Sequence, residues 1–227
     1  MTERISAAPD TGGSTRAQPL DAALVRRLAA IAVMEPTIDL AKRDNFVAAE
    51  GWHVDAREAA LQAEAAGAPE PNGPFVTACD ILRRYAFPPP SLIRGTFDPD
   101  APLDNRAMLL TATYLWMTFE LPVRVSRVID LTRDGTHGAE RVWGYSYQTL
   151  AGHLERGEIT FEIVKHLASG GVTFRIHSFS QTGHIANIVH RIGFRIVGRR
   201  LQRRFAEASL RNMRIMVAQA MVDRPRS

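Results

Sequence analysis

The stretch from Val142 to Gln181 constrains the fold most, because apolar and polar residues alternate along it in three successive runs. Alternation with a period of two is typical of β-strands that bury one face. Ser169-Gly-Gly171 separates the last two runs and predicts a hairpin turn. This stretch therefore predicts three neighbouring antiparallel strands.

Each of these strands has two distinct rows of side chains. Apolar and aromatic rows are formed by Trp143, Tyr145, Tyr147 and Thr149, by Ile159, Phe161 and Ile163, and by Val172, Phe174 and Ile176. The opposite rows hold Gly144, Ser146 and Gln148, then Glu158, Thr160 and Glu162, then Thr173, Arg175 and His177. The pattern leaves two interpretations open, namely a core row with a solvated row, or a polar-lined binding surface.

Three earlier segments add to the sheet. They are Ser91 to Phe97, a long run from Ala107 to Phe119, and Val123 to Leu131 with Val123, Val125, Ile129 and Leu131 on one side. With Glu140 to Thr149, Glu158 to His166 and Val172 to Ser180, we expect about six strands in an antiparallel meander.

Helical patterns flank the strands. Asp21 is expected to cap a helix with Leu24 and Leu28 on its apolar face, and a further turn is expected around Ile38 to Phe46. The Ala/Glu-rich segment from Asp55 to Ala66 is predicted to be helical, and residues 74–85 form an amphipathic pattern that begins at Pro74.

The last segment, Gly183 to Val222, is expected to be helical with a break near Gly193 or Gly198, because the apolar residues change face there. We therefore predict an α+β domain: a curved antiparallel sheet packed on a long C-terminal helix, with extra N-terminal helices. Residues 1–18 are expected to be a disordered tail, and residues 19–223 a single domain with peripheral helices at 19–70 and a core at 74–222.

Composition excludes several classes of protein. With 227 residues, 45% hydrophobic and 23% charged, the chain is an ordinary globular one. A single cysteine, Cys79, and an N-terminus without an apolar core predict a cytoplasmic protein, and no apolar run is long enough to span a bilayer. We interpret Cys79 as a buried apolar group because no base lies beside it in the sequence.

The loop from Ala151 to Glu158 is the best local candidate for chemistry. His153, Glu155 and Glu158 are residue types that bind metals or exchange protons, yet their spacing matches no helical zinc motif. Hydrogen bonding of His153 to the backbone and pairing of the glutamates with Arg156 or Arg175 explain the loop equally well. We expect neither a metal nor a cofactor.

The net charge of +4 arises largely from the last helix. Its polar side carries Arg199, Arg200, Arg203, Arg211 and Arg214, which indicates an ordinary solvated face or weak contact with an anionic membrane surface or partner. No nucleic-acid-binding motif accompanies this charge, so nucleic acid is not expected as a partner.

The segments VWGYSYQTLAGHLERGEITFEIVKH, VTFRIHSFSQ and IGFRIVGRRLQRRF resemble the DUF1990 family, also described as UPF0548. The resemblance covers about residues 45 to 213, although Gln148 and Ser180-Gln-Thr182 stand where many relatives have Gly and Ser-Arg-Pro. It implies the START or Bet v 1 type of helix-grip architecture, in which a curved sheet surrounds a long C-terminal helix and an internal cavity. The predicted order of elements agrees with this.

From the sheet pattern and this resemblance we expect a binding protein for a small apolar or lipid-like molecule, held between the sheet and the last helix. The alternative is a cyclase- or hydrolase-like enzyme that uses His153, Glu155 or His177 as acid or base, and a third class is an interaction protein with a filled core. The candidate ligand-binding residues are Tyr145, Tyr147, Thr149, His153, Glu155, Glu158, Arg175, His177 and Ser180. No catalytic residue is assigned.

Overall fold

The computed structural model describes residues 21–114, 117–136, 138–182 and 188–223, with the side chains at 114, 117, 182 and 188–201 excluded. The predicted N-terminal tail lies outside these residues. Three helices, two 3₁₀ turns and seven strands occur in the described part. They are α1 (Ala22–Ala32), η1 (Leu40–Asn45), η2 (Ala48–Glu50), β1 (His53–Ala60), α2 (Pro74–Arg83), β2 (Ile93–Thr96), β3 (Ala107–Tyr114), β4 (Met117–Gly135), β5 (Gly138–Thr149), β6 (Glu155–His166), β7 (Val172–Thr182) and α3 (Ile188–Val222).

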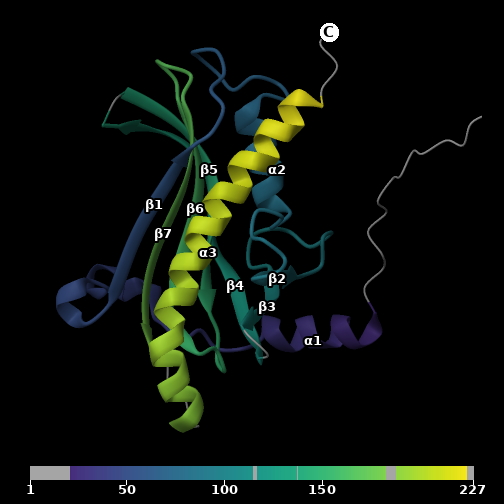
Figure 1. The fold of residues 1–227 in the computed structure, drawn as a ribbon, viewed down its shortest axis with the longest axis vertical. Helices are drawn as coiled ribbons and strands as arrows, with labels where there is room; N and C mark the ends of the chain where they lie inside the picture. The colour runs from purple at the N-terminus through teal and green to yellow at the C-terminus, as the bar shows by residue number, and fades with distance from the viewer. Residues whose placement is uncertain (1–20, 115–116, 137, 183–187, 224–227) are drawn as a thin grey trace, which may run out of the picture.

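The strands form one antiparallel sheet in the order β1-β7-β6-β5-β4-β3-β2. The sheet is curved, and α3 crosses it diagonally with α2 beside it (Figure 1). We call the side of the sheet toward α2 and α3 the inner face, which carries Tyr145, Phe161 and Phe174, and the opposite side the outer face. The predicted α+β, helix-grip-like architecture is confirmed.

The main core lies between the inner face and the two helices. All three apolar rows predicted for β5, β6 and β7 contribute to it, together with α2 residues such as Phe75 and Leu82 and α3 residues such as Met213 and Val217. Cys79 is buried in this core, and burial raises the pKa of its thiol. Its predicted role as a buried apolar group is confirmed.

The N-terminal helix also agrees with its prediction. Asp21 caps α1 by accepting a hydrogen bond from the Ala23 N–H at 2.7 Å, and Leu28 and Ile31 are buried. These two residues pack against Leu109 and Leu150, so α1 covers the sheet near β3.

The Ala/Glu-rich segment beginning at Asp55 is not a helix, and this prediction was wrong. Residues 53–60 form the edge strand β1, which pairs with β7 along its whole length, from His53 opposite Ser180 to Ala60 opposite Thr173. The free edge of β7 offers a continuous row of hydrogen-bond partners, and that pairing overrides the weak helical preference of alanine and glutamate.

The predicted long strand from Ala107 to Phe119 is two strands, because β3 ends at Tyr114, which pairs with Met117 at the start of β4. The sequence from Ala107 to Phe119 contains no glycine, proline, asparagine or aspartate, so no turn-forming residue marks the boundary between the two strands.

A register shift in β4 corrects another prediction. The pairing with β5 is irregular between Val125 and Arg127. Val123 and Val125 are therefore in the main core, whereas Ile129 packs with Val142 and Val164 on the outer face. The four apolar residues predicted to share one side of this strand are divided between the two faces, as a β-bulge requires.

The C-terminal helix is continuous through Gly193 and Gly198, so the predicted break does not occur. A glycine inside a helix costs only about 1 kcal/mol relative to alanine, and a long helix tolerates it. In the part whose side chains are described, the buried residues are Ala206, Ala208, Ser209, Met213 and Val217.

A buried ion pair links the β1–α2 connection to the sheet. Lys165 Nζ lies 2.6 Å from Glu64 Oε1, and both side chains are fully excluded from solvent. The Glu64 carboxylate also accepts hydrogen bonds from the Phe75 and Glu70 backbone N–H groups, each at 3.2 Å. Glu64 N donates to the carbonyl of Gly170, a residue with φ +74° where a Cβ would lie 1.9 Å from Glu64 O.

We predict that Glu64→Gln destabilises the fold by about 3–5 kcal/mol, because Lys165 would remain buried without a counter-charge. Urea denaturation measures the loss. Glu70→Gln, at an exposed neighbour, is the control and should cost less than about 1 kcal/mol. Replacing both members, with Glu64→Gln and Lys165→Met, should recover most of the stability; equal losses in Glu64→Gln and Glu70→Gln would contradict the prediction.

Candidate functional site

A cavity of about 170 Å³ lies between the inner face of the sheet and α3. Its apolar lining comes from five strands, the residue before β2 and the helix, and consists of Leu92, Ile93, Leu110, Ala112, Leu121, Ile159, Ile176, Phe179, Phe205 and Ala206. Polar side chains gather at β1, at the adjoining ends of β5, β6 and β7, and on α3: His53, Asp55, Arg57, Tyr147, Thr149, His153, Glu155, Ser178, Ser180 and Gln202. The surface that the cavity exposes is nevertheless mostly apolar, as in many ligand sites.

The structure brings together six of the nine candidate residues: Tyr147, Thr149, His153, Glu155, Glu158 and Ser180 all border this cavity. Tyr145 lies deeper in the core, where its hydroxyl donates to the Leu82 carbonyl at 3.2 Å. Whether the six bind a ligand stays a prediction.

Arg175 and His177 do not belong with the other candidates. Both alternate with Phe174 and Ile176 along β7, and they therefore project from the outer face. There they line a separate groove. A cavity site containing all nine residues is therefore wrong, and His177 is remote from any chemistry at Glu155.

Glu158 borders the cavity, but its carboxylate is already engaged elsewhere. It accepts a hydrogen bond from Ser126 Oγ at 2.6 Å and lies 2.5 Å from the Arg43 guanidinium. The carboxylate is fully buried, so this pairing compensates the cost of removing it from water. Glu158 has a structural role in this arrangement.

His153 is held by the backbone at the start of β6. Its Nδ1 lies 3.0 Å from the backbone N and 2.9 Å from the carbonyl oxygen of Glu155, so this ring nitrogen meets both a donor and an acceptor of the same residue. Burial lowers the pKa of His153 to about 4. The imidazole is therefore neutral at physiological pH, with one ring nitrogen that donates and one that accepts.

Glu155 is the carboxyl group best placed to meet a ligand. Gln202 Nε2, from α3, lies 2.6 Å from Glu155 Oε2 and 3.2 Å from Ser180 Oγ, so one amide connects the helix to β6 and β7. Burial raises the pKa of Glu155 to about 7, although the hydrogen bond from Gln202 acts in the opposite direction. Near neutral pH this group can therefore either donate or accept a proton.

Two tyrosine hydroxyls lie next to each other in the buried core. The hydroxyls of Tyr147 and Tyr85 are 3.4 Å apart, and burial raises the pKa of Tyr147 to about 12. Both phenols are uncharged at neutral pH, and Tyr147, which borders the cavity, supplies a hydrogen-bonding group without adding charge.

Sequence reasoning missed Asp55, Arg57 and Gln202. The first two were placed on a predicted helix, whereas the edge strand β1 turns them toward the cavity, where they form an ion pair of 2.9 Å. Gln202 is a single amide in a helix rich in arginine, and only the packing of α3 against β6 and β7 reveals its role.

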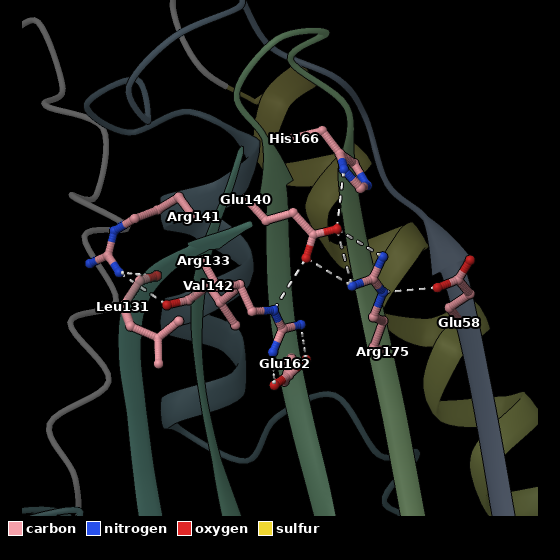
Figure 2. A network of polar contacts seen from close by, with 9 residues as sticks. All are labelled: Glu58, Leu131, Arg133, Glu140, Arg141, Val142, Glu162, His166 and Arg175. Carbon is pink, nitrogen blue, oxygen red and sulfur yellow. Dashed lines mark hydrogen bonds and ion pairs between the residues drawn. The ribbon is translucent and has the colours of Figure 1, made fainter. Parts of the chain in front are cut away.

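On the outer face, Arg175 belongs to a network of charges around Glu140 (Figure 2). Glu140 lies 3.2 Å from Arg175 and 3.3 Å from Arg133, and Arg175 also binds Glu58 at 2.9 Å. Burial alone would raise the pKa of Glu140, but the hydrogen bonds and charges of the two arginines outweigh it and lower the pKa. Arg175 is thus fully engaged in a structural network.

Two other classes of feature do not occur in the described part of the chain. No three His, Cys, Asp or Glu side chains come together there as ligands for a metal would. No helix there combines the length and the apolar character that crossing a membrane requires.

The curved sheet, the long C-terminal helix and the cavity between them define an α+β protein of the helix-grip type. The chain belongs to the DUF1990 family, described as a domain of unknown function, whose model matches residues 40–212. The resemblance inferred from the sequence is thereby confirmed.

Comparison with solved structures finds similar folds at low sequence identity. Ara h 8.0201 is 12% identical with a TM-score of 0.46, covering 74% of this chain and 99% of that chain. A point mutant of norcoclaurine synthase from Thalictrum flavum, in complex with a transition-state analogue, is 11% identical with a TM-score of 0.46, covering 75% and 96%. An uncharacterised protein from Rhizobium leguminosarum is 11% identical with a TM-score of 0.40, covering 74% and 95%. No curated protein matches the sequence.

Glu155→Gln is predicted to remove a pH dependence from the stability. The pKa of Glu155 is about 7 in the folded state, whereas an unfolded glutamate has a pKa of about 4.3. The folded state therefore binds the extra proton between these values, and the unfolding free energy of the wild type should fall as pH rises through them. Relative to the variant, the fall should be up to about 3 kcal/mol, measured by urea denaturation at about pH 5 and about pH 8.

Glu207→Gln serves as the control, because Glu207 is an exposed carboxylate on the same helix as Gln202. Its stability should follow that of the wild type across this range. Parallel curves for Glu155→Gln and the wild type would show that Glu155 does not hold a raised pKa.

Proposed function

We propose that the protein binds a small, largely apolar molecule in the cavity between the inner face and α3. The observation that carries this proposal is the apolar lining itself, interrupted by a polar group at Glu155, His153 and Gln202. Such a combination favours a ligand with an apolar body and one hydrogen-bonding group.

The size of the cavity restricts the ligand. An engineered apolar cavity of about 150 Å³ is large enough to bind benzene. At about 170 Å³, the present cavity has room for a molecule with one ring and few substituents, and a long-chain lipid would have to extend beyond it. The lipid-like ligand considered from the sequence is therefore the weaker form of the proposal.

The polar group favours a ligand with a hydroxyl or an amine. Below a pH of about 7 the Glu155 carboxyl is protonated, and above it the carboxylate accepts hydrogen bonds. The neutral His153 imidazole supplies a second hydrogen-bonding group. A phenol or a similar small molecule satisfies both groups while its ring contacts the apolar wall.

An enzyme remains the alternative, and it is favoured by the raised pKa of Glu155 beside His153. His177 no longer belongs to this alternative because it lies on the outer face. Native mass spectrometry distinguishes the two functions. A binding protein should release the added molecule unchanged, whereas an enzyme should release one of altered mass.

The third class of function, an interaction protein, depends on the arginines of α3. Arg203, Arg211 and Arg214 are exposed, and the side chains of Arg199 and Arg200 lie outside the described residues. Contact with an anionic membrane surface remains a proposal. Co-sedimentation with anionic vesicles at low salt tests it, and absence of binding would remove it.

p-Cresol is the probe for the cavity, followed by NMR chemical-shift titration. Ala206→Phe places a ring in the cavity from α3, and it should weaken p-cresol binding on the order of tenfold or more because the space is filled. Ala112→Leu narrows the cavity from β3 and provides a second, milder variant.

The matched control is Ala218→Phe, which adds the same ring at an exposed position of α3 and should leave binding unchanged. The proposal fails if the wild type does not bind p-cresol, or if folded Ala206→Phe and Ala112→Leu bind it as well as the wild type does.

A further inference from the structure

A second hollow crosses the outer face of the sheet, away from the apolar cavity. This groove has a volume of about 430 Å³, and its lining includes Arg43, Arg127, Thr160, Arg175 and His177. In contrast to the inner cavity, its lining is largely charged: four arginines line it together with two glutamates, Glu58 and Glu162.

The register of the sheet aligns four polar residues across this groove. Arg127 on β4 pairs with Ser146 on β5, which pairs with Thr160 on β6, which pairs with His177 on β7. Neighbouring strands are about 4.8 Å apart, so the Cα atoms of Arg127 and His177 are separated by roughly 14 Å. Arg127 and His177 form the two sides of the groove, and the shorter Ser146 and Thr160 form the floor between them.

The hydroxyls of Ser146 and Thr160, at the floor of the groove, can donate a hydrogen bond to a molecule bound in it. Ser146 Oγ and Thr160 Oγ1 are 2.8 Å apart, so one hydroxyl donates to the other. The second hydroxyl proton has no acceptor among the described contacts. Ser146 is fully buried and Thr160 is 8% exposed, so Thr160 is the hydroxyl that a ligand in the groove would meet.

The carboxylates around the groove are already neutralised. Glu162 forms two hydrogen bonds with Arg133, at 3.1 and 2.9 Å, and Arg175 binds both Glu58 and Glu140 (Figure 2). Arg43 is paired with Glu158. In the part of the chain that the structure describes, Arg127 has no carboxylate within 4.0 Å, although it is exposed at the edge of the groove. The groove thus holds a positive charge without a counter-ion.

We propose that this groove binds the phosphate group of a small phosphomonoester. The Arg127 guanidinium approaches the phosphate from one side, His177 from the other, and the Thr160 hydroxyl from below. A guanidinium presents a planar set of donors that matches phosphate oxygens, and a phosphate has three terminal oxygens for donors arriving from three directions. Because the groove exceeds the size of the anion, it also accommodates the organic part of the ester.

Isothermal titration at low ionic strength tests this proposal, with inorganic phosphate and phenyl phosphate as separate probes. The wild type should bind phenyl phosphate more tightly than inorganic phosphate. Arg127→Gln should weaken both affinities on the order of tenfold, the usual effect of losing a charge-assisted hydrogen bond. Arg26→Gln, which removes an equal charge from an exposed position on α1, is the matched control and should change them less than about twofold.

Thr160→Val is the second variant, because it removes the hydroxyl while keeping the shape of the side chain. Its circular dichroism should remain that of the wild type while the affinity for phenyl phosphate falls severalfold. Three outcomes would overturn the proposal: no binding of either probe by the wild type, equal losses in Arg127→Gln and Arg26→Gln, or unchanged affinity in both Arg127→Gln and Thr160→Val. Tighter binding of inorganic phosphate than of phenyl phosphate would reject an ester as the ligand.

Discussion

The ion pair between Glu64 and Lys165 governs how the helices meet the sheet. Lys165 projects from β6 into an otherwise apolar inner face, where an unpaired charge would cost several kcal/mol. Glu64 neutralises it and also binds the first turn of α2 through Phe75 N. One carboxylate therefore sets the position of the β1–α2 connection, and through it the packing of α2 against α3 above the sheet.

The two faces of the sheet are chemically separate although their residues alternate in sequence. On the inner face, aromatic and aliphatic rows surround a cavity in which the His153 imidazole and the Tyr147 phenol are uncharged at neutral pH and Asp55 pairs with Arg57. On the outer face, arginines and glutamates pair with one another across the strands. Because β-strand side chains alternate, a single short sequence can build an apolar site and a charged surface within a few ångströms of each other.

Much of this architecture follows from the sequence. The rows of β5, β6 and β7 were predicted correctly because their alternation is regular and Gly170 marks the turn. The strand β1 was not predicted, because its alanines and glutamates favour a helix in isolation. It forms a strand because it pairs with the edge of β7. The pairing of Gln202 with Glu155 joins residues 47 positions apart. No local sequence pattern predicts a contact between residues so far apart in the chain. The most polar part of the candidate site could therefore be found only from the structure.

The irregularity in β4 has a consequence for evolution and for engineering. One residue of β4, Ser126, has no partner in the pairing with β5. Val125 therefore faces the core while Arg127 faces the groove on the outer face. In a regular strand these two positions would face the same way. Loss of Ser126, the extra residue, would therefore leave Val125 and Arg127 on opposite faces and remove only the hydrogen bond to Glu158, whereas loss of a residue from the regular part of the strand would exchange the faces of the residues on one side of the deletion.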